Sequence, residues 1–168
     1  TIILAIDISR SGIWGSEGRS KRERLAELGA LLAFSANRNG DKVGLILFSD
    51  QIEKYLPPAK GQKHVLRILR EILFHQNQGS GTDLNEGLRF LNRVMRRRSV
   101  VFLLSDFIIP EYQSEEESIE NLFLKELSTT RRKHDLVCCQ IHDIKEKEFP
   151  NVGRDCQEDA ETGVSIVI

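Results

Sequence analysis

A set of oxygen-bearing side chains in the sequence has the chemistry of a metal site. The set consists of Asp7, Ser9, Ser11, Thr82 and Asp106. The first three occupy alternate positions directly after the apolar run 2–6, and the last follows the apolar run VVFLLS. Carboxylate and hydroxyl oxygens without nitrogen or sulfur favour a hard cation, so we expect Mg²⁺, with Mn²⁺ and Ca²⁺ as the alternatives.

The spacing Asp-x-Ser-x-Ser suits a loop that curls around one point and turns every second side chain inward. Mg²⁺ takes six oxygens at about 2.1 Å and usually keeps several waters. Two carboxylates balance the charge of a dication. If they act through waters, the metal remains electron-poor and attracts a carboxylate from outside. These groups predict a binding site and no enzyme, because the set lacks the groups that catalysis needs.

Each of these residues also has an ordinary structural interpretation. Ser9 or Ser11 alone is typical of a turn or a helix cap, Thr82 alone of a helix N-cap, and Asp106 alone of a cap for a following turn. Their joint placement after strand-like runs favours the metal site over these separate roles.

The elements that must position this set alternate between apolar strands and amphipathic helices. The expected strands are 2–6, 43–48, 51–56, 99–105, 135–141 and 163–167. The expected helices are 20–38, 61–75, 83–96 and 116–133. This pattern predicts a single α/β domain, a Rossmann-like three-layer sandwich whose mostly parallel central sheet is covered by helices on both faces. Ligands bind such sheets at the carboxyl ends of the strands, so the five side chains converge if strands 2–6 and 99–105 are neighbours.

Local patterns give expectations for individual side chains. We expect Pro57-Pro58 to stop the edge strand 51–56, Cys138 and Cys139 to be small buried side chains, and the final strand 163–167 to lie at a sheet edge. The helix 20–38 should turn four leucines inward, and the helix 61–75 should turn four aliphatic side chains inward. These residues are Leu25, Leu28, Leu31 and Leu32, and then Val65, Leu69, Ile72 and Leu73.

Composition limits the classes of partner and the location. The chain has 168 residues, 40% of them hydrophobic and 29% charged, with a formal net charge of −1. This balance gives no reason to expect nucleic acid or an anionic membrane as the main partner. The basic clusters 21–24, 96–98 and 131–133 are expected to be solvated helix faces and ends.

Neither a secretory signal nor a membrane span of roughly 18 apolar residues is visible. The three cysteines lack the pattern of a disulfide framework, which favours a reducing, cytoplasmic compartment. Because the chain starts with Thr inside a strand pattern, we expect a fragment of a longer protein; an anchor outside it would associate it with a membrane.

With these residues in place, the sequence resembles a von Willebrand factor A-type domain, and the five side chains resemble the metal-ion-dependent adhesion site (MIDAS) of that fold. Further segments resemble a prokaryotic uncharacterised family with this domain, whose genes typically neighbour those of MoxR-type AAA ATPases. The segments are NRNGDKVGLILFSD (37–50), LPPAKG (56–61), GTDLNEGLRFL (81–91), VVFLLSDF (100–107) and FPNVGRDCQEDAETG (149–163).

The resemblance implies a metal-dependent protein-interaction domain that works with an AAA ATPase in chaperone-like assembly or maturation. It also implies that Ser9, Ser11 and Thr82 touch the metal, whereas Asp7 and Asp106 hold coordinated waters. A Glu or Asp of a protein partner completes the coordination. The family often has Met after the second Ser of the motif, where this chain has Gly12; the departure leaves the metal set intact and concerns the partner surface.

Two other functions are compatible with parts of the pattern. Asp7 resembles the nucleophile of Mg²⁺-dependent phosphoryl-transfer enzymes of haloacid-dehalogenase type, but Ser9 stands where their second Asp is usual. A degenerate structural domain that binds nothing is the other alternative. Trp14 is either a partner contact or a residue packed on the sheet edge. Asp83 either caps the following helix or orients a metal-bound water, and the cap is favoured.

Overall fold

The computed structural model describes residues 1–9, 21–79, 81–108 and 119–141, together with the short segments 156–158 and 165–167. Its main sheet has the strand order β3-β2-β1-β4-β5. The strands are β1 (Ile2–Asp7), β2 (Val43–Phe48), β3 (Ile52–Ala59), β4 (Val100–Ser105) and β5 (Asp135–Gln140). The helices are α1 (Lys21–Arg38), α2 (Gln62–Phe74), α3 (Leu84–Val94) and α4 (Ile119–Lys133).

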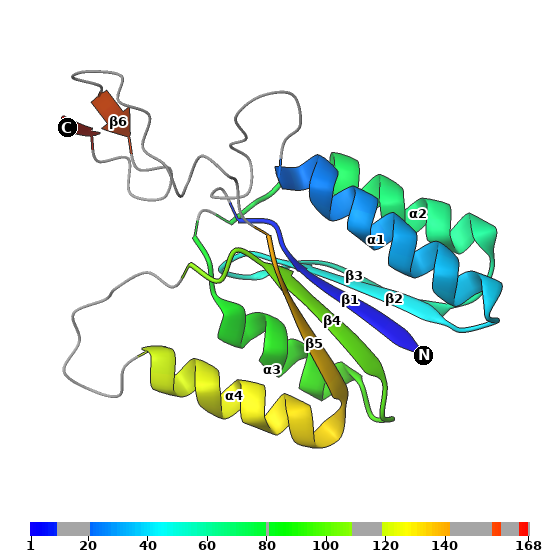
Figure 1. Ribbon diagram of the computed structural model, residues 1–168. Coiled ribbons are helices and arrows are strands. Elements are labelled where there is room, and N and C mark those ends of the chain that lie inside the picture. The colour runs from blue at the N-terminus through cyan, green and yellow to red at the C-terminus, as the bar shows by residue number, and fades with distance from the viewer. Residues whose placement is uncertain (10–20, 80, 109–118, 142–155, 159–164, 168) are drawn as a thin grey trace.

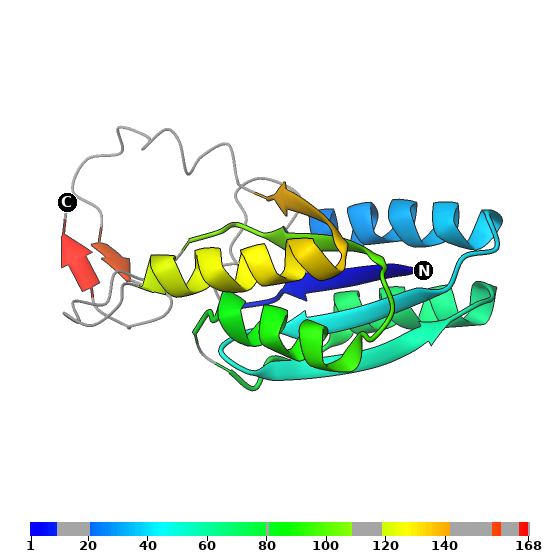
Figure 2. The same cartoon turned by 90° about the horizontal axis from the view of Figure 1, so that it is seen from below.

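The predicted α/β architecture is confirmed. Figures 1 and 2 show α1 and α2 on one face of the sheet and α3 and α4 on the other. Strand β1 pairs in parallel with both β2 and β4, while β3 pairs antiparallel with β2 at the edge. The chain leaves β1 toward β2 on one side and later returns to β4 on the other side. The strand order therefore reverses between β1 and β4, so the condition set from the sequence, that strands 2–6 and 99–105 are neighbours, is met.

Two apolar cores lie on the two faces of the sheet. Alternate residues of β1 point to opposite faces, so Leu4 and Ile6 pack with the α1 and α2 side, whereas Ile3 and Ala5 pack with the α3 side. All four are fully buried. A strand that is apolar on both faces is typical of the interior of a parallel sheet, and it fixes β1 in the middle of the molecule.

The inward faces of α1 and α2 differ from the predicted ones. Leu31 is 67% exposed, and Leu73 is exposed as well, although both were expected in the core. In α1 the buried stripe contains the small residues Ala26, Gly29 and Ala33, with leucines at its flanks. Small residues let α1 lie close to the sheet and to α2. The side chains on this face are therefore the buried ones, and Leu31 lies on the outer side of the helix.

Two expectations about the edge strands of the main sheet are also wrong. Strand β3 continues through Pro57-Pro58 to Ala59; an edge strand tolerates proline because one of its sides needs no N–H donors. Cys138 in β5 is exposed and Cys139 is only half-buried, since β5 is the other edge strand of this sheet. The last strand, β7 (Ser165–Val167), is an edge strand as expected, and it pairs antiparallel with β6 (Cys156–Glu158) in a separate two-stranded sheet.

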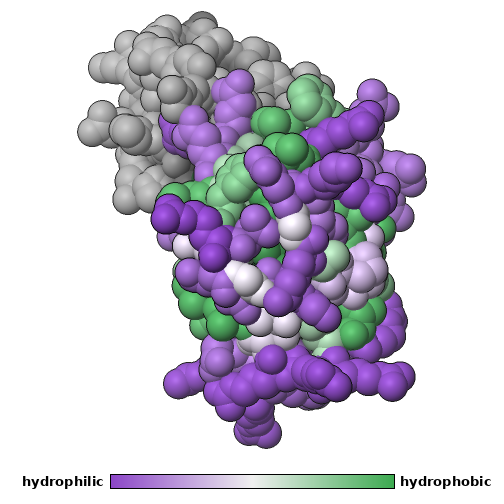
Figure 3. Space-filling view, turned by 90° about the vertical axis from the view of Figure 1, so that its right-hand side faces the viewer, coloured by the Kyte–Doolittle hydropathy of each residue, from purple (hydrophilic) through white to green (hydrophobic). Residues whose placement is uncertain are grey.

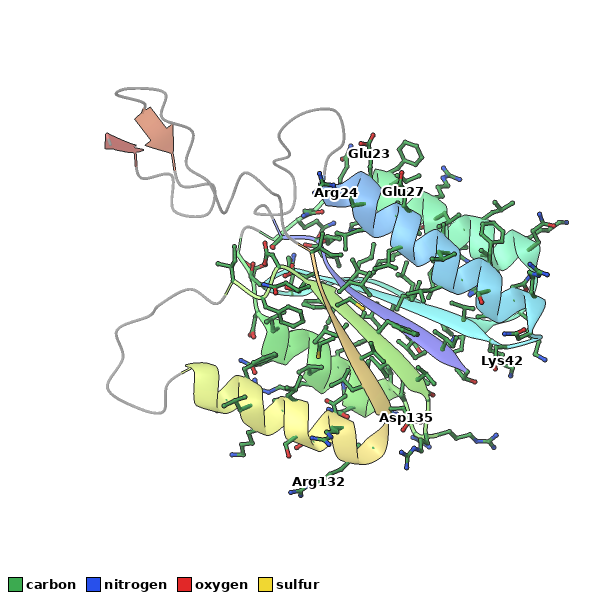
Figure 4. The ribbon with its side chains drawn as sticks, in the orientation of Figure 1. Glu23, Arg24, Glu27, Lys42, Arg132 and Asp135 are labelled. Carbon is green, nitrogen blue, oxygen red and sulfur yellow. The ribbon has the colours of Figure 1, made fainter. Side chains whose placement is uncertain are left out.

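The amino ends of the parallel strands form a strongly hydrophilic end of the molecule. Figure 3 views this end, where hydrophilic residues gather along the lower edge, and Figure 4 marks it with Lys42, Arg132 and Asp135. The basic runs 96–98 and 131–133 are exposed there, as predicted. Within the described part of the chain, no helix combines the length and apolarity needed to cross a membrane.

Gly87 lies where α3 packs closely against Phe48 of β2, and a substitution there tests this close packing. A Cβ atom at Gly87 would lie 2.9 Å from ring atoms of Phe48, a rigid neighbour that is fully buried. We expect Gly87→Ala to lower the free energy of unfolding by about 1–3 kcal/mol in denaturant titrations, as overpacking does, although alanine favours helix.

Gly29→Ala is the matched control, because its Cβ would also lie 2.9 Å from a neighbour, but that neighbour is the terminal Cδ1 of Ile72. This methyl group can move, so the control should cost less than the test substitution. Equal losses in the two variants would show that the Phe48 ring does not limit the approach of α3.

Candidate functional site

The carboxylate of Asp7 ends the central strand and is held by neutral hydrogen-bond donors. Asp7 is 5% exposed. Its Oδ1 accepts a hydrogen bond of 2.9 Å from the Ser9 N–H, and its Oδ2 accepts one of 2.7 Å from the Ser105 hydroxyl. Ser9 is buried beside it. The first turn after β1 is therefore folded back onto the carboxylate, as a loop that curls around one point must be.

The neighbouring strand ends in a second buried carboxylate. Asp106 is 9% exposed, and its Oδ1 accepts a hydrogen bond of 3.1 Å from the Ile108 N–H. Phe107, between Asp106 and Ile108, has a φ of 57°, which is unusual for an aromatic residue. Its ring packs against Phe123 of α4 with 6.4 Å between centroids, and its N–H donates to the Ser105 hydroxyl. Strained backbone of this kind concentrates at functional sites, where surrounding contacts hold it.

Burial and a neighbouring carboxylate make the ionised form of Asp7 costly. Burial raises the pKa of Asp7 above its usual value, and the nearby Asp106 raises it further, while hydrogen bonds from Ser9 and Ser105 act in the opposite direction. In the described part of the chain, none of the groups that shift this pKa is a cation. Two buried carboxylates close together are costly unless a proton or a cation compensates them.

Thr82 stands next to the N-cap of α3 and does not form that cap. The cap is Asp83, whose Oδ1 accepts hydrogen bonds from the backbone N–H groups of Asn85 (2.8 Å) and Glu86 (3.3 Å). The sequence placed Thr82 at the cap, and this is corrected; the alternative that Asp83 caps the helix is confirmed. A carboxylate accepts from two amides and is favoured by the helix dipole, which explains why Asp83 takes the position.

The ends of β1 and β2 connect Thr82 to the same end of the sheet as Asp7. Asp7 pairs with Phe48 in the parallel register, and the Ile8 N–H donates to the Phe48 carbonyl at 2.8 Å. The next residue, Ser49, accepts a hydrogen bond of 2.9 Å at its carbonyl oxygen from the Asp83 N–H. Thr82 therefore enters α3 beside the strand end that borders Asp7.

Sequence reasoning missed Glu53, a buried carboxylate of β3 that organises the segment before Thr82. Its side chain is 1% exposed. It accepts hydrogen bonds from the N–H groups of Gln78 (3.1 Å) and Gly79 (2.7 Å) and from the Ser49 hydroxyl (2.8 Å). These bonds hold the pKa of Glu53 down to about 2, against the effect of burial. An acidic residue in an edge strand normally faces water, so the sequence carries no signal for this role.

Two other side chains that the sequence reasoning did not assign fix the same segment. The Asn77 side-chain amide donates to the carbonyl of Ile8, which directly joins the segment to the turn after β1. Arg22 of α1 donates to the carbonyl oxygens of Ile72 (2.7 Å) and His75 at the end of α2. Arg22 was expected to be solvated within its basic cluster, but it is half-buried, and burial lowers its pKa.

The structure brings together Asp7, Ser9 and Asp106 at the switch point and places Thr82 at the same end of the sheet. Ser11 lies outside the described residues, as does Trp14, so their predicted roles stay predictions. Among the described residues, no group of three or more His, Cys, Asp or Glu side chains is placed to hold a metal ion. The predicted set differs from such a group because it has two carboxylates and takes its other oxygens from hydroxyls. The metal site remains a prediction.

The described histidines lie apart from the cluster around Asp7. The backbone N–H of His134 donates to the Thr130 carbonyl at 2.8 Å at the end of α4, and the His64 ring contacts the Val43 carbonyl at 2.8 Å. His75 lies near Glu53 at 3.3 Å. None of these contacts joins the cluster around Asp7.

The fold and the cluster define a three-layer α/β protein with buried carboxylates at the switch point of its sheet. The chain matches the family described as "Protein of unknown function DUF58" over residues 1–168 and belongs to it. Relatives include the uncharacterized proteins Rv1480 of Mycobacterium tuberculosis and Mb1516 of Mycobacterium bovis, each 25% identical over 96% of this chain. The match covers 48% of these relatives, so the chain spans about half of their length.

Solved structures of other proteins share this fold. An aerotolerance-related membrane protein from Bacteroides fragilis has a TM-score of 0.67 at 18% identity, covering 99% of this chain and 80% of that protein's chain. The conserved hypothetical protein BatB from Bacteroides thetaiotaomicron has a TM-score of 0.67 at 20% identity, covering 99% and 78%. The pilus adhesin SpaC from Lactobacillus rhamnosus GG has 0.64 at 14%, covering 83% and 24%.

Acid titration tests the hydrogen bonds to Glu53. Because its pKa falls from 4.5 to about 2 on folding, the ionised carboxylate stabilises the fold at neutral pH, and this stabilisation is lost as the pH falls from about 4.5 toward 2. Glu53→Gln should therefore be less stable than the wild type at pH 7, and the difference in free energy of unfolding should shrink across that interval. Glu126→Gln, in an exposed ion pair with Arg89, is the control. A difference independent of pH would contradict the assignment.

Proposed function

We propose that the chain is a von Willebrand factor A-type interaction domain that binds a partner carboxylate through Mg²⁺. The observation that carries the proposal is the pair of buried carboxylates, Asp7 and Asp106, at the switch point of the sheet. Asp7 accepts hydrogen bonds from the Ser9 N–H and the Ser105 hydroxyl, Asp106 accepts one from the Ile108 N–H, and the described groups that shift the pKa of Asp7 include no cation. A dication between the two strand ends would offset both charges.

The residues present fit a hard cation. Asp7 and Asp106 supply carboxylates that are already oriented by backbone and hydroxyl donors, while Ser9 and Thr82 supply neutral oxygens at the same end of the sheet. Ser11 is proposed as the third hydroxyl ligand on the resemblance alone. A bound dication supplies Lewis acidity toward an external carboxylate. The chain contributes the fixed oxygens and the low-dielectric surroundings, which make that attraction stronger than in water.

The partner that we propose is a protein that offers Glu or Asp, and specifically an AAA ATPase of MoxR type. The sequence resemblance supports this partner, and the function would be chaperone-like assembly or maturation. Among proteins of similar fold, one is named a pilus adhesin, and adhesion is a protein-interaction function. We propose a cytoplasmic location for the domain, in keeping with the free thiols of Cys138 and Cys139.

A phosphoryl-transfer enzyme is the second candidate, and the geometry favours it less. Both oxygens of Asp7 accept hydrogen bonds, and the residue is buried, whereas a nucleophile needs a lone pair that a substrate can reach. Hydrolysis of a generic phosphoester by the pure protein, lost in Asp7→Asn, would nevertheless support it. A degenerate domain that binds nothing is the third candidate.

Calorimetric titration with Mg²⁺ and Mn²⁺ distinguishes the first and third candidates. We expect one bound ion per chain in the wild type and none in Asp106→Ala. Asp7→Asn should also lose the ion, yet the metal-free variant should unfold at a higher temperature, because a buried charge beside Asp106 is removed.

Asp135→Asn is the matched control, since Asp135 is exposed and pairs with Arg98 at the opposite end of the sheet. It should bind the ion like the wild type. A wild type that binds no ion, or an Asp106→Ala variant that binds it with unchanged affinity, refutes the proposed metal site.

Affinity capture from a lysate of the source cells, with and without chelator, tests the partner. We expect an AAA ATPase to be retained by the wild type with Mg²⁺, and to be lost with chelator or in Asp106→Ala. Circular dichroism of the variant controls for folding. Retention of the ATPase that is insensitive to chelator and to Asp106→Ala would contradict a metal-bridged contact.

A further inference from the structure

We infer that Glu53 is a positioning residue for the metal site: it fixes the Thr82 loop, defined as residues 75–82, in the geometry that presents Thr82 to the ion. The inference rests on the proposed function. It assigns a role to a side chain in the edge strand β3, away from the residues that the sequence pattern selected. Residue 80 of the loop lies outside the described residues, and the contacts on either side of it carry the argument.

Glu53 holds the loop through its backbone. Gly79 N–H donates to Oε1 at 2.7 Å, and Gln78 N–H donates to both carboxylate oxygens at 3.1 Å. The His75 ring lies 3.3 Å from Oε2. The side chain is 1% exposed, so these amides have exchanged water for one buried carboxylate. A backbone held in this way resists displacement, because moving it would leave a buried charge without its donors.

The loop is shaped to lie against the β2–β3 turn. A Cβ atom at Gly79 would overlap the Asp50 carboxylate and the Ser49 hydroxyl, so a larger residue here would have to displace these two side chains. Beyond it, the Gly81 N–H donates to Asp50 at 3.4 Å, and the Asp83 N–H donates to the Ser49 carbonyl at 2.9 Å. The residues before and after Thr82, Gly81 and Asp83, therefore both donate hydrogen bonds to the β2–β3 turn.

The loop is also attached directly to the turn that carries the metal ligands after β1. The Asn77 side-chain amide donates to the carbonyl of Ile8, which lies between Asp7 and Ser9. Displacement of residues 77–79 would therefore alter two of the segments that must converge on one ion. Groups that orient metal ligands without touching the metal commonly change the affinity for the ion by about 10–100-fold.

The loop is held by the ionised carboxylate of Glu53 and not merely by a side chain of its size. The carboxylate accepts at both oxygens from several donors, and a glutamine in the same place would turn an NH₂ group toward one of them. Glu53→Gln keeps the size of the side chain, so its effect on the loop is a loss of acceptors and charge. The variant thereby separates positioning from packing.

A double-mutant cycle tests the inference. Mg²⁺ and Mn²⁺ affinities are measured by calorimetry for the wild type, Glu53→Gln, Thr82→Ala and the double variant. We expect Glu53→Gln to weaken binding by about 10-fold or more in the wild-type background and to weaken it less when Thr82 is already alanine. Equal weakening in both backgrounds would overturn the positioning role.

Amide spectra supply a readout that does not depend on the ion. In ¹⁵N-labelled metal-free protein, the Gly79 resonance should move and its hydrogen exchange should accelerate in Glu53→Gln, while strands β1 and β4 stay unchanged. Gly79→Ala, whose Cβ would press on the Asp50 and Ser49 side chains where the loop meets the β2–β3 turn, should also weaken Mg²⁺ binding. Glu126→Gln is the control for a lost carboxylate elsewhere.

The outcomes separate this inference from the function on which it rests. If the wild type binds no ion, the proposed function fails, and the metal-positioning role fails with it, whatever the amide spectra show. If the wild type binds and Glu53→Gln binds with equal affinity, only the role of Glu53 is overturned. A Glu53→Gln protein that has lost its folded spectrum is replaced in the cycle by Gly79→Ala, and unchanged affinity in that variant also overturns the role.

Discussion

The burial of Asp7 at the end of the central strand is the constraint on which the rest of the structure depends. Strand β1 is apolar on both faces and flanked by β2 and β4, so a carboxylate at its end is surrounded by a hydrophobic sheet and by the turns that follow. An ionised carboxylate in such surroundings requires donors on every side from which water is excluded. The described donors are a backbone amide and a hydroxyl, and the next charged group is a second carboxylate, Asp106.

A cation between the two strand ends would offset the charges of these carboxylates, and this is the physical argument behind the metal site that we propose. Among the described residues, the groups that shift the pKa of Asp7 include no lysine or arginine. Ser105 instead donates to Asp7 while accepting from the strained Phe107 backbone, which fixes the orientation of both strand ends without neutralising them. Two oriented and buried carboxylates at neighbouring strand ends are what the proposed binding site requires.

The sequence predicted the parts of this arrangement that depend on local pattern. Continuous apolar runs separated by amphipathic helices indicated the mostly parallel sheet, and the carboxylates after the runs of β1 and β4 indicated a site on the condition that these two strands are neighbours. The prediction was wrong where a choice between neighbouring residues depends on packing. Leu31 is exposed because small residues occupy the inner face of α1. Asp83, and not Thr82, caps α3 because its carboxylate accepts hydrogen bonds from two backbone amides.

Glu53 could not be predicted for a different reason. Its contacts with Gln78 and Gly79 join residues more than twenty positions apart, and they exist because antiparallel β3 begins at the end of the sheet where β1 and β4 finish. No local pattern distinguishes this glutamate from a solvated edge residue.

The antiparallel edge strand has a further consequence for the site. In a sheet whose strands are otherwise parallel, loops at the carboxyl ends are normally held by the strands that they follow. The Thr82 loop follows a helix, and β3 is the strand that supplies its anchor, through one side chain near the β2–β3 turn. In the role that we propose for it, Glu53 at the edge of the sheet thus helps to fix the position of Thr82, because its carboxylate accepts hydrogen bonds from backbone amides of the Thr82 loop.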